Sequence, residues 1–277
     1  MNALIVLKQA LCLCTRFETK AIEDVAVPFL SPAMYSAPAS KAKMLRVVFF
    51  GMDLGILDEL RLCPIHLIGT YLPFTPYRAV GQSFFPLKLF PLIKKKLRTA
   101  AVHTPLVEFL SKHHIRALKS PNINAKKFRN ELARLKPDLG VVANFGQILG
   151  SRLLSIPKYG FINYHPSLLP RYRGPSPLGH ILLNGETRSG VTWHRITEKV
   201  DQGEILAQKD FEIEPHYTLK DLEHVCMELA VKLLPPLIVE IAEGKVKPQR
   251  QDEAFASYYP KLTKKEKEQL LSMGKIG

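Results

Sequence analysis

Asn163 and His165 lie two residues apart in FINYH, a short segment with the composition of a β-strand. In an extended chain alternate side chains point to the same face, so Phe161, Asn163 and His165 share one face. Pro166 ends the strand directly after His165. A carboxamide and an imidazole at a strand end can both donate hydrogen bonds to one carbonyl oxygen on which negative charge develops. Taken alone, an N-x-H strand end is more often structural.

The residues that follow His165 resemble those of a known enzyme family. The loop SLLPRYRG runs from Ser167 to Gly174, and the segment VDQGEIL further along contains Asp201. Together with Asn163 and His165, these motifs resemble the 10-formyltetrahydrofolate-dependent formyltransferases. The segment PQRQDEAFASYYPKLT at 248–263 is similar to one found in methionyl-tRNA formyltransferases. The resemblance implies transfer of a formyl group from 10-formyltetrahydrofolate, the co-substrate, to the amino group of methionyl-tRNA.

The resemblance also assigns catalytic roles. Asn163 and a protonated His165 would stabilise the oxyanion of a tetrahedral intermediate. Asp201 would favour the protonated ring of His165 by charge pairing and would carry the proton, directly or through water. In a loop followed by Gly203, Asp201 alone would more often be explained as turn chemistry.

The resemblance implies that two loops form the walls of the folate pocket, mainly through backbone atoms. The expected folate-binding residues are Phe145, Gly146, Gln147, Ile148, Leu149, Ile196 and Val200. Ser167, Leu168 and Gly174 would shape the mouth that admits the acceptor. Arg171 and Arg173 would offer positive charge to an acidic acceptor, with ordinary surface exposure as the alternative. We interpret His180 and His194 as structural.

These residues require a fold that brings several strand ends together. Apolar strands alternate with amphipathic helices, and the resemblance implies a Rossmann-like formyltransferase fold of the α/β class, with a mostly parallel sheet and helices on both faces. Strands are expected at 46–51, 66–71, 139–144, 161–165, 191–196 and 204–213, and helices at 102–115, 125–135, 176–186 and 218–234. In the last helix Thr218 and Asp221 form a capping box. Pro235 and Pro236 are expected to interrupt that helix, leaving a further turn or two at 237–242 that ends at Gly244.

We expect three regions along the chain. Residues 44–244 form the catalytic domain, residues 1–43 an N-terminal extension and a candidate for disorder, and residues 245–277 a linker-like tail without a complete second domain. Met44 is an alternative start of translation. The C-terminal barrel of methionyl-tRNA formyltransferases, which helps to hold tRNA, is expected to be lacking.

Composition bounds the cellular setting. The formal net charge of +14 favours a polyanionic partner such as tRNA. Four cysteines, at positions 12, 14, 63 and 226, show neither metal-ligand spacing nor a disulfide framework, so we expect no metal and a reducing compartment. Without an apolar run of roughly 18 residues, a membrane span is not expected. We expect a cytoplasmic protein, with a mitochondrial location as the alternative. Glu18, Glu23 and Asp24 make the N-terminus a poor mitochondrial presequence.

Alternatives remain for the acceptor and for activity itself. The segment 73–97 departs from methionyl-tRNA formyltransferases, and its basic run at Lys94, Lys95 and Lys96, continued by Arg98, is either a phosphate contact or a solvated helix face. One alternative is an enzyme that formylates a small amine, such as a nucleotide-linked amino sugar. Another is a non-catalytic folate- or RNA-binding module, against which the presence of Asn163, His165 and Asp201 argues. The oligomeric state remains open.

Overall fold

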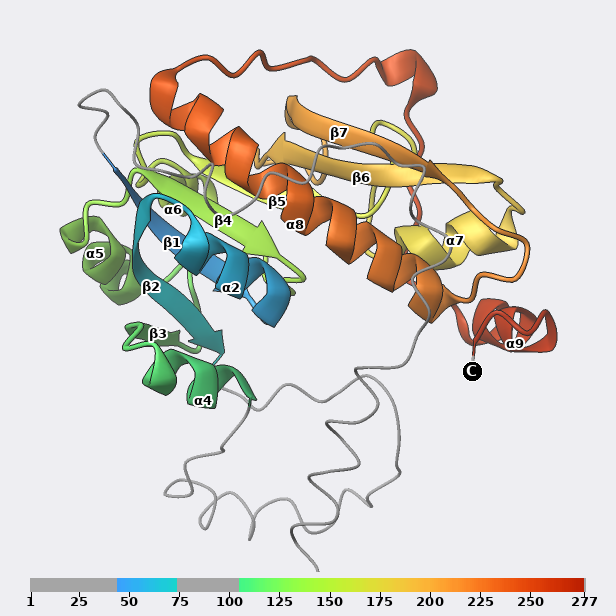
Figure 1. Cartoon of the computed structure of the whole chain (residues 1–277), viewed down its shortest axis with the longest axis horizontal. Coiled ribbons are helices and arrows are strands. Elements are labelled where there is room, and N and C mark those ends of the chain that lie inside the picture. Colours follow the sequence, from blue (N-terminus) through green and yellow to red (C-terminus); the bar gives the residue numbers. More distant parts are fainter. Residues whose placement is uncertain (1–43, 74–104, 277) are drawn as a thin grey trace, which may run out of the picture. The chain divides into compact units, whose positions relative to one another are not determined.

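A seven-stranded sheet organises the computed structural model, which describes residues 44–73 and 105–276 (Figure 1). The strands lie in the order β3-β2-β1-β4-β5-β6-β7. Their bounds are β1 Leu45–Gly51, β2 Ile65–Pro73, β3 Ala117–Ser120, β4 Leu139–Ala143, β5 Phe161–His165, β6 Arg188–Arg195 and β7 Ile205–Glu212. The first five strands in the order pair in parallel, and β6 and β7 are antiparallel to their neighbours. The predicted α/β class with a mostly parallel sheet is confirmed.

The central strands are apolar because both of their faces are covered. Val47 and Phe49 of β1 belong to one buried hydrophobic cluster, whereas Val48 and Phe50 belong to a second cluster on the opposite face. Alternation along an extended chain produces this division, and parallel strands buried on both sides therefore lack the polar alternation of surface strands.

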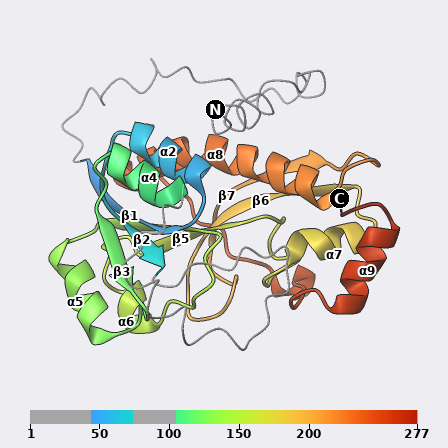
Figure 2. The same ribbon diagram turned by 90° about the horizontal axis from the view of Figure 1, so that it is seen from below.

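Helices cover both faces of the sheet, as predicted (Figure 2). On the face of the first cluster lie α2 (Leu54–Leu62), α4 (Pro105–Lys112) and α8 (Leu219–Glu243). On the other face lie α5 (Lys126–Arg134) and α6 (Ser151–Leu154). Helix α7 (Pro177–Leu183) packs against both α8 and α9 (Lys264–Ser272). None of the helices among the described residues is long and apolar enough to cross a membrane.

Helix α8 confirms its predicted ends and corrects its predicted interruption. Thr218 and Asp221 form the capping box, and Gly244 closes the helix with a φ of 66°. The helix nevertheless runs unbroken through Pro235 and Pro236, so the expected break is wrong. Leu234, Pro235, Leu237 and Ile238 are all buried. Tertiary packing of this apolar face outweighs the hydrogen bonds that the two prolines remove.

Residues 245–276 are packed against the catalytic domain, which corrects the expectation of a linker-like tail. This segment contains a short 3-10 helix, η3 (Glu253–Phe255), followed by α9. Leu270 of α9 is fully buried in the first cluster. The backbone of Arg173 exchanges hydrogen bonds with Ser257 and Tyr259, and Ile205 pairs with Gln249. The domain therefore continues beyond residue 244.

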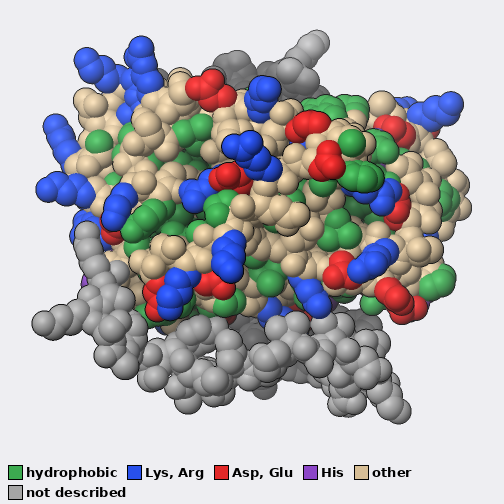
Figure 3. All heavy atoms as spheres, turned by 90° about the horizontal axis from the view of Figure 1, so that it is seen from above, with side chains coloured by type: hydrophobic (Ala, Val, Ile, Leu, Met, Phe, Trp, Pro, Cys, Tyr) green, Lys and Arg blue, Asp and Glu red, His purple; other side chains and the backbone are tan. Residues whose placement is uncertain are grey.

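The described surface carries charges of both signs. On the face seen in Figure 3, Lys and Arg side chains are interspersed with Asp and Glu. The basic run at Lys94, Lys95 and Lys96, the segment 73–97 beyond Pro73 and the extension at 1–43 lie outside the described residues.

Candidate active site

The pairing of β5 with β6 brings two predicted residues together with two that were not predicted. In this antiparallel pair Asn163 lies opposite His194, and His165 lies opposite Thr192. Directly opposed residues on one face of a sheet are close enough for their side chains to interact. Nδ2 of Asn163 lies 3.2 Å from Nε2 of His194. All four side chains lie on the same face of the sheet, the face on which the side chain of Phe161 also lies.

His165 is buried, with both ring nitrogens facing oxygen atoms. Nε2 lies 2.8 Å from the carbonyl oxygen of Tyr172, which can only accept, so Nε2 carries a proton. Nδ1 lies 3.7 Å from Oδ2 of Asp201. That separation is longer than a hydrogen bond, so the Asp201 carboxylate acts on the ring through its charge and leaves Nδ1 available to a ligand.

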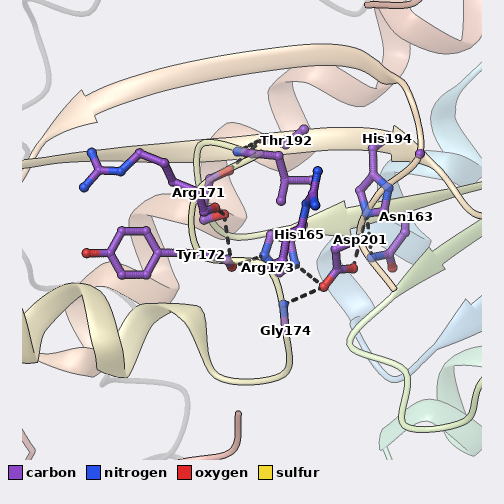
Figure 4. Close-up of polar contacts among 12 residues, drawn as sticks. Asn163, His165, Arg171, Tyr172, Arg173, Gly174, Thr192, His194 and Asp201 are labelled. Atoms are coloured by element: carbon purple, nitrogen blue, oxygen red, sulfur yellow. Dashed lines mark hydrogen bonds and ion pairs between the residues drawn. The ribbon is translucent and has the colours of Figure 1, made fainter. Parts of the chain in front are cut away.

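Asp201 reaches this cluster from the loop between β6 and β7. Oδ2 accepts a hydrogen bond of 2.8 Å from the backbone N–H of Gly174, and Oδ1 lies 3.6 Å from Nε2 of His194. The backbone of Asp201 has a φ of 53°, a left-handed conformation that Asp tolerates better than most residues. Figure 4 shows the carboxylate between the His165 and Gly174 side of the site and the His194 side. The three predicted catalytic residues thus lie together.

His194 was interpreted as structural from the sequence, yet it lies in the cluster. Its Nδ1 donates to the carbonyl oxygen of Arg195 at 2.8 Å, which leaves Nε2 to accept from Asn163 in the neutral ring. Burial, followed by the neighbouring charge of His165, lowers the pKa of His194 to about 4, against the opposing effect of Asp201. A neutral His194 therefore fixes which way the Asn163 amide points. In the sequence, His194 could be recognised as a site residue only by knowing that its strand pairs with FINYH and places it opposite Asn163.

Side chains of β6 and β7 hold the loop after His165 through hydrogen bonds to its backbone. Ser167, one of the residues expected at the acceptor mouth, is fully buried, and its hydroxyl donates to the carbonyl oxygen of Arg171 at 2.8 Å. Thr192 donates to the carbonyl oxygen of Ser167 at 2.7 Å, and Gln208 donates to that of Leu169 at 3.0 Å. Ser167 therefore shapes the loop and does not face an acceptor. Leu168 is half-buried.

Arg173 does not offer its charge to solvent, which corrects one expectation. Its side chain is 5% exposed, and its guanidinium binds Gln251 and Glu253. The hydrogen bond from Arg173 lowers the pKa of Glu253. Arg171 is exposed and pairs with Glu186. Of the two arginines, only Arg171 remains at the surface as predicted.

The backbone of Gly174 passes close to the C-terminal segment. Its φ is 108°, and a Cβ atom at this position would lie 2.1 Å from the carbonyl oxygen of Tyr259. Only glycine accommodates this combination of conformation and close approach. Gly174 thus has a defined structural role in presenting its N–H to Asp201.

The predicted folate loops lie against the second hydrophobic cluster. Phe145 and Ile196 both pack on it, and the ring of Phe145 lies 5.3 Å from that of Tyr71. Gln147 donates to the hydroxyl of Tyr71 at 3.1 Å. The remaining expected residues divide by exposure: Leu149 is buried, and Gly146, Ile148 and Val200 are exposed. The two loops therefore share one hydrophobic floor and present apolar side chains to solvent.

Asn124, which the sequence did not single out, fixes the end of the first loop. Its amide donates to the carbonyl oxygen of Ile148 at 2.8 Å and accepts from the N–H of Gly150 at 2.8 Å. One side chain thereby satisfies two backbone groups of the loop.

The described residues contain no group of three or more His, Cys, Asp or Glu side chains arranged to hold a metal ion. Burial raises the pKa of Cys63 to about 12 and raises that of Cys226 further. Both thiols therefore stay protonated at neutral pH and are poor nucleophiles and metal ligands.

The chain is similar in sequence to several known proteins. The model of a family described as formyl transferase matches residues 93–238, more than half of the chain. Methionyl-tRNA formyltransferase of Bacillus licheniformis is 33% identical over 235 residues, which cover 84% of this chain and 69% of that protein. The Thermotoga maritima protein of the same name is 36% identical over 163 residues, 59% of this chain and 52% of that protein. The chain thus spans about half the length of several of the relatives that it matches.

Solved structures share the fold at lower identity. A sugar 3N-formyl transferase, WlaRD, crystallised in the presence of dTDP and 5-N-formyl-THF, gives a TM-score of 0.58 at 19% identity and covers 79% of this chain and 70% of its own. Glycinamide ribonucleotide transformylase 1 from Symbiobacterium toebii gives 0.58 at 20% identity and covers 76% of this chain and 100% of its own. These likenesses establish the arrangement of the sheet and its helices.

Proposed function

Because this chain belongs to the formyl transferase family, we propose that it transfers a formyl group from 10-formyltetrahydrofolate to an amine, and that methionyl-tRNA supplies the amine. The amine nitrogen attacks the formyl carbon, the bond from that carbon to N10 of the folate breaks, and one proton passes from the amine to N10. Between these events the formyl oxygen carries negative charge in a tetrahedral intermediate.

Asn163 and His165 stabilise that oxygen. His194 accepts one N–H of the Asn163 amide, and the second N–H is left to donate to the oxyanion. Nδ1 of His165 is the second donor, because its separation of 3.7 Å from Asp201 is longer than a hydrogen bond, whereas Nε2 is occupied by the Tyr172 carbonyl oxygen. Donors of this kind contribute on the order of 2.7 to 4 kcal/mol each to transition-state stability in acyl-transfer enzymes.

Asp201 accepts the proton that the amine loses and passes it to the leaving nitrogen, directly or through water. The distance of 3.7 Å between Oδ2 of Asp201 and Nδ1 of His165 is the observation that carries the proposal. A base beside a ring that binds the oxyanion serves both halves of the reaction from one place.

The folate occupies the side of the site bounded by residues 145–149 and 196–200. Ile148 and Val200, which are 74% and 44% exposed, are large apolar side chains that a pterin ring would cover. Phe145 and Leu149 pack inward and leave backbone atoms of the loop to hydrogen-bond the ring. This arrangement is expected of a pocket that binds its ligand mainly through backbone hydrogen bonds.

Methionyl-tRNA is favoured as acceptor by the names of the relatives at 33% to 38% identity. The segment PQRQDEAFASYYPKLT, which is similar to one in methionyl-tRNA formyltransferases, packs directly beside the site through its contacts to Arg173. Solved sugar formyltransferases share the fold at identities too low to carry a substrate.

The test is consumption of 10-formyltetrahydrofolate by the purified full-length chain, with charged initiator methionyl-tRNA in one assay and a panel of nucleotide-linked amino sugars in another. We expect formyl-methionyl-tRNA to appear. Turnover restricted to a sugar would overturn the proposed acceptor and keep the reaction. Folate binding without turnover on either acceptor class would favour a non-catalytic module.

A further inference from the structure

Gln251 connects the two loops that meet at the site. Its Nε2 donates to the backbone carbonyl oxygens of Asp201 at 2.8 Å and of Gly203 at 2.7 Å. Its Oε1 accepts from Nε and Nη2 of Arg173 at 3.0 and 2.8 Å. A carboxamide has two N–H donors and two acceptor lone pairs, so the side chain is fully used.

These bonds close a ring of contacts around the Asp201 carboxylate. Gly174, whose N–H binds that carboxylate, directly follows Arg173. Gln251 holds Arg173 at one end and the backbone of Asp201 at the other. The carboxylate is thus fixed from its own backbone and from the loop that it touches.

The backbone that Gln251 holds is conformationally costly. Asp201 has a φ of 53°, a left-handed conformation that Asp enters more readily than most residues but that is still less favourable than the right-handed or extended regions. A Cβ at Gly203 would lie 1.8 Å from the carbonyl oxygen of Arg195, so the turn is also tight. Such a conformation persists only where surrounding contacts impose it.

We propose that Gln251 is a positioning residue, which holds the Asp201 carboxylate beside His165, where it can take the proton that the amine loses. This inference rests on the proposed role of Asp201. It assigns a catalytic consequence to the C-terminal segment, which docks on the domain and carries Gln251 to the site. Without the amide donors the two carbonyl groups lose their partner, and the loop relaxes away from its left-handed turn.

Two substitutions separate the donor from the rest of the side chain. Gln251→Glu has the same shape and keeps an oxygen for Arg173, but presents a carboxylate to the two carbonyl groups. Gln251→Met has similar length and removes both sets of bonds. Gln249→Met is the matched control, because Gln249 is exposed in the same segment and contributes backbone hydrogen bonds to Ile205.

The measurements are kcat, KM for the folate, the melting temperature, and hydrogen exchange of peptides that cover Gly174 and residues 197–203. We expect Gln251→Glu to lower kcat by about 100-fold, the scale that misplacement of a reacting group by about 1 Å produces. KM for the folate and the melting temperature should change little. Exchange should accelerate at both loops, and the Gln249→Met control should match the unsubstituted protein.

Unchanged kcat in both Gln251 variants would overturn the proposal. A loss of kcat that only accompanies a lower melting temperature and faster exchange throughout the chain would also overturn it, because that pattern describes general destabilisation. If the unsubstituted protein formylates no acceptor, the proposed function fails, while the exchange data still decide whether Gln251 holds the two loops.

Discussion

Oδ2 of Asp201 lies 3.7 Å from Nδ1 of His165, and the same carboxylate approaches Nε2 of His194 at 3.6 Å through Oδ1. One carboxylate therefore faces two histidines, whose partners differ. Nε2 of His165 faces the Tyr172 carbonyl oxygen, whereas Nδ1 of His194 donates to the Arg195 carbonyl oxygen. Burial lowers the pKa of His194 to about 4 and keeps that ring neutral, while the Asp201 carboxylate lies between the two rings.

Asp201→Asn should abolish formyl transfer while folate binding survives. The substitution keeps the shape of the side chain and removes the base, and general-base catalysis is worth about 100-fold or more. Single-turnover rates and equilibrium folate binding measure the two effects separately. Asp210→Asn is the control, because Asp210 pairs with Arg188 at the surface, away from the site. Substantial residual turnover in Asp201→Asn would contradict the role of Asp201 as the base.

Asn163→Ala should lower kcat by about 100- to 1,000-fold, the loss seen when one oxyanion donor is removed. KM should be nearly unchanged, since the interaction strengthens only in the transition state. Steady-state kinetics provide the measurement. Asn130→Ala is the control, because Asn130 is exposed on helix α5. An equal rise in KM with intact kcat would instead assign Asn163 to ground-state binding.

The free energy of unfolding should fall as pH decreases from 6.5 toward 4 because of His194. Its pKa is 6.5 in a model peptide and about 4 in the folded protein, so in this window the unfolded state binds more protons. Protonation therefore favours unfolding there, and His194 contributes no slope above about pH 6.5. The contribution amounts to at most about 3 kcal/mol.

Denaturant unfolding at pH 7 and at pH 4.5 measures this effect, with His194→Gln as the comparison. The amide oxygen of Gln can still accept from Asn163, but the side chain does not titrate. We expect the unsubstituted protein to lose more stability than His194→Gln over this interval. Equal losses would show that His194 does not carry the pH dependence.

Gly174→Ala should destabilise the protein and reduce formyl transfer. Gly185→Ala should destabilise the protein only slightly and leave formyl transfer unchanged. Both glycines have positive φ, 108° and 64°, which costs alanine about 1 to 2 kcal/mol at either site. Only at Gly174 would the added Cβ meet a backbone oxygen, that of Tyr259 at 2.1 Å. We expect a loss of about 3 kcal/mol there. Melting curves and kcat for the pair test the difference, and equal losses would contradict it.

Local patterns determined several elements and the family of this chain. Strand alternation in FINYH, with Pro166 after it, sets the shared face of Asn163 and His165, because side-chain direction in a strand follows from the backbone alone. The capping box of Thr218 and Asp221 sets the start of α8 for the same kind of local reason. The motifs around His165 and Asp201 were sufficient to predict the formyl transferase family, which is confirmed.

Only the tertiary structure decided which distant groups meet. The pairing of β5 with β6 sets His194 opposite Asn163, docking of residues 248–263 buries Arg173 and delivers Gln251, and core packing carries α8 through its two prolines. Each of these outcomes depends on strand register, loop closure or packing between segments far apart in the chain. Local propensity contains no information about such contacts, because their energies arise only when the whole domain is assembled.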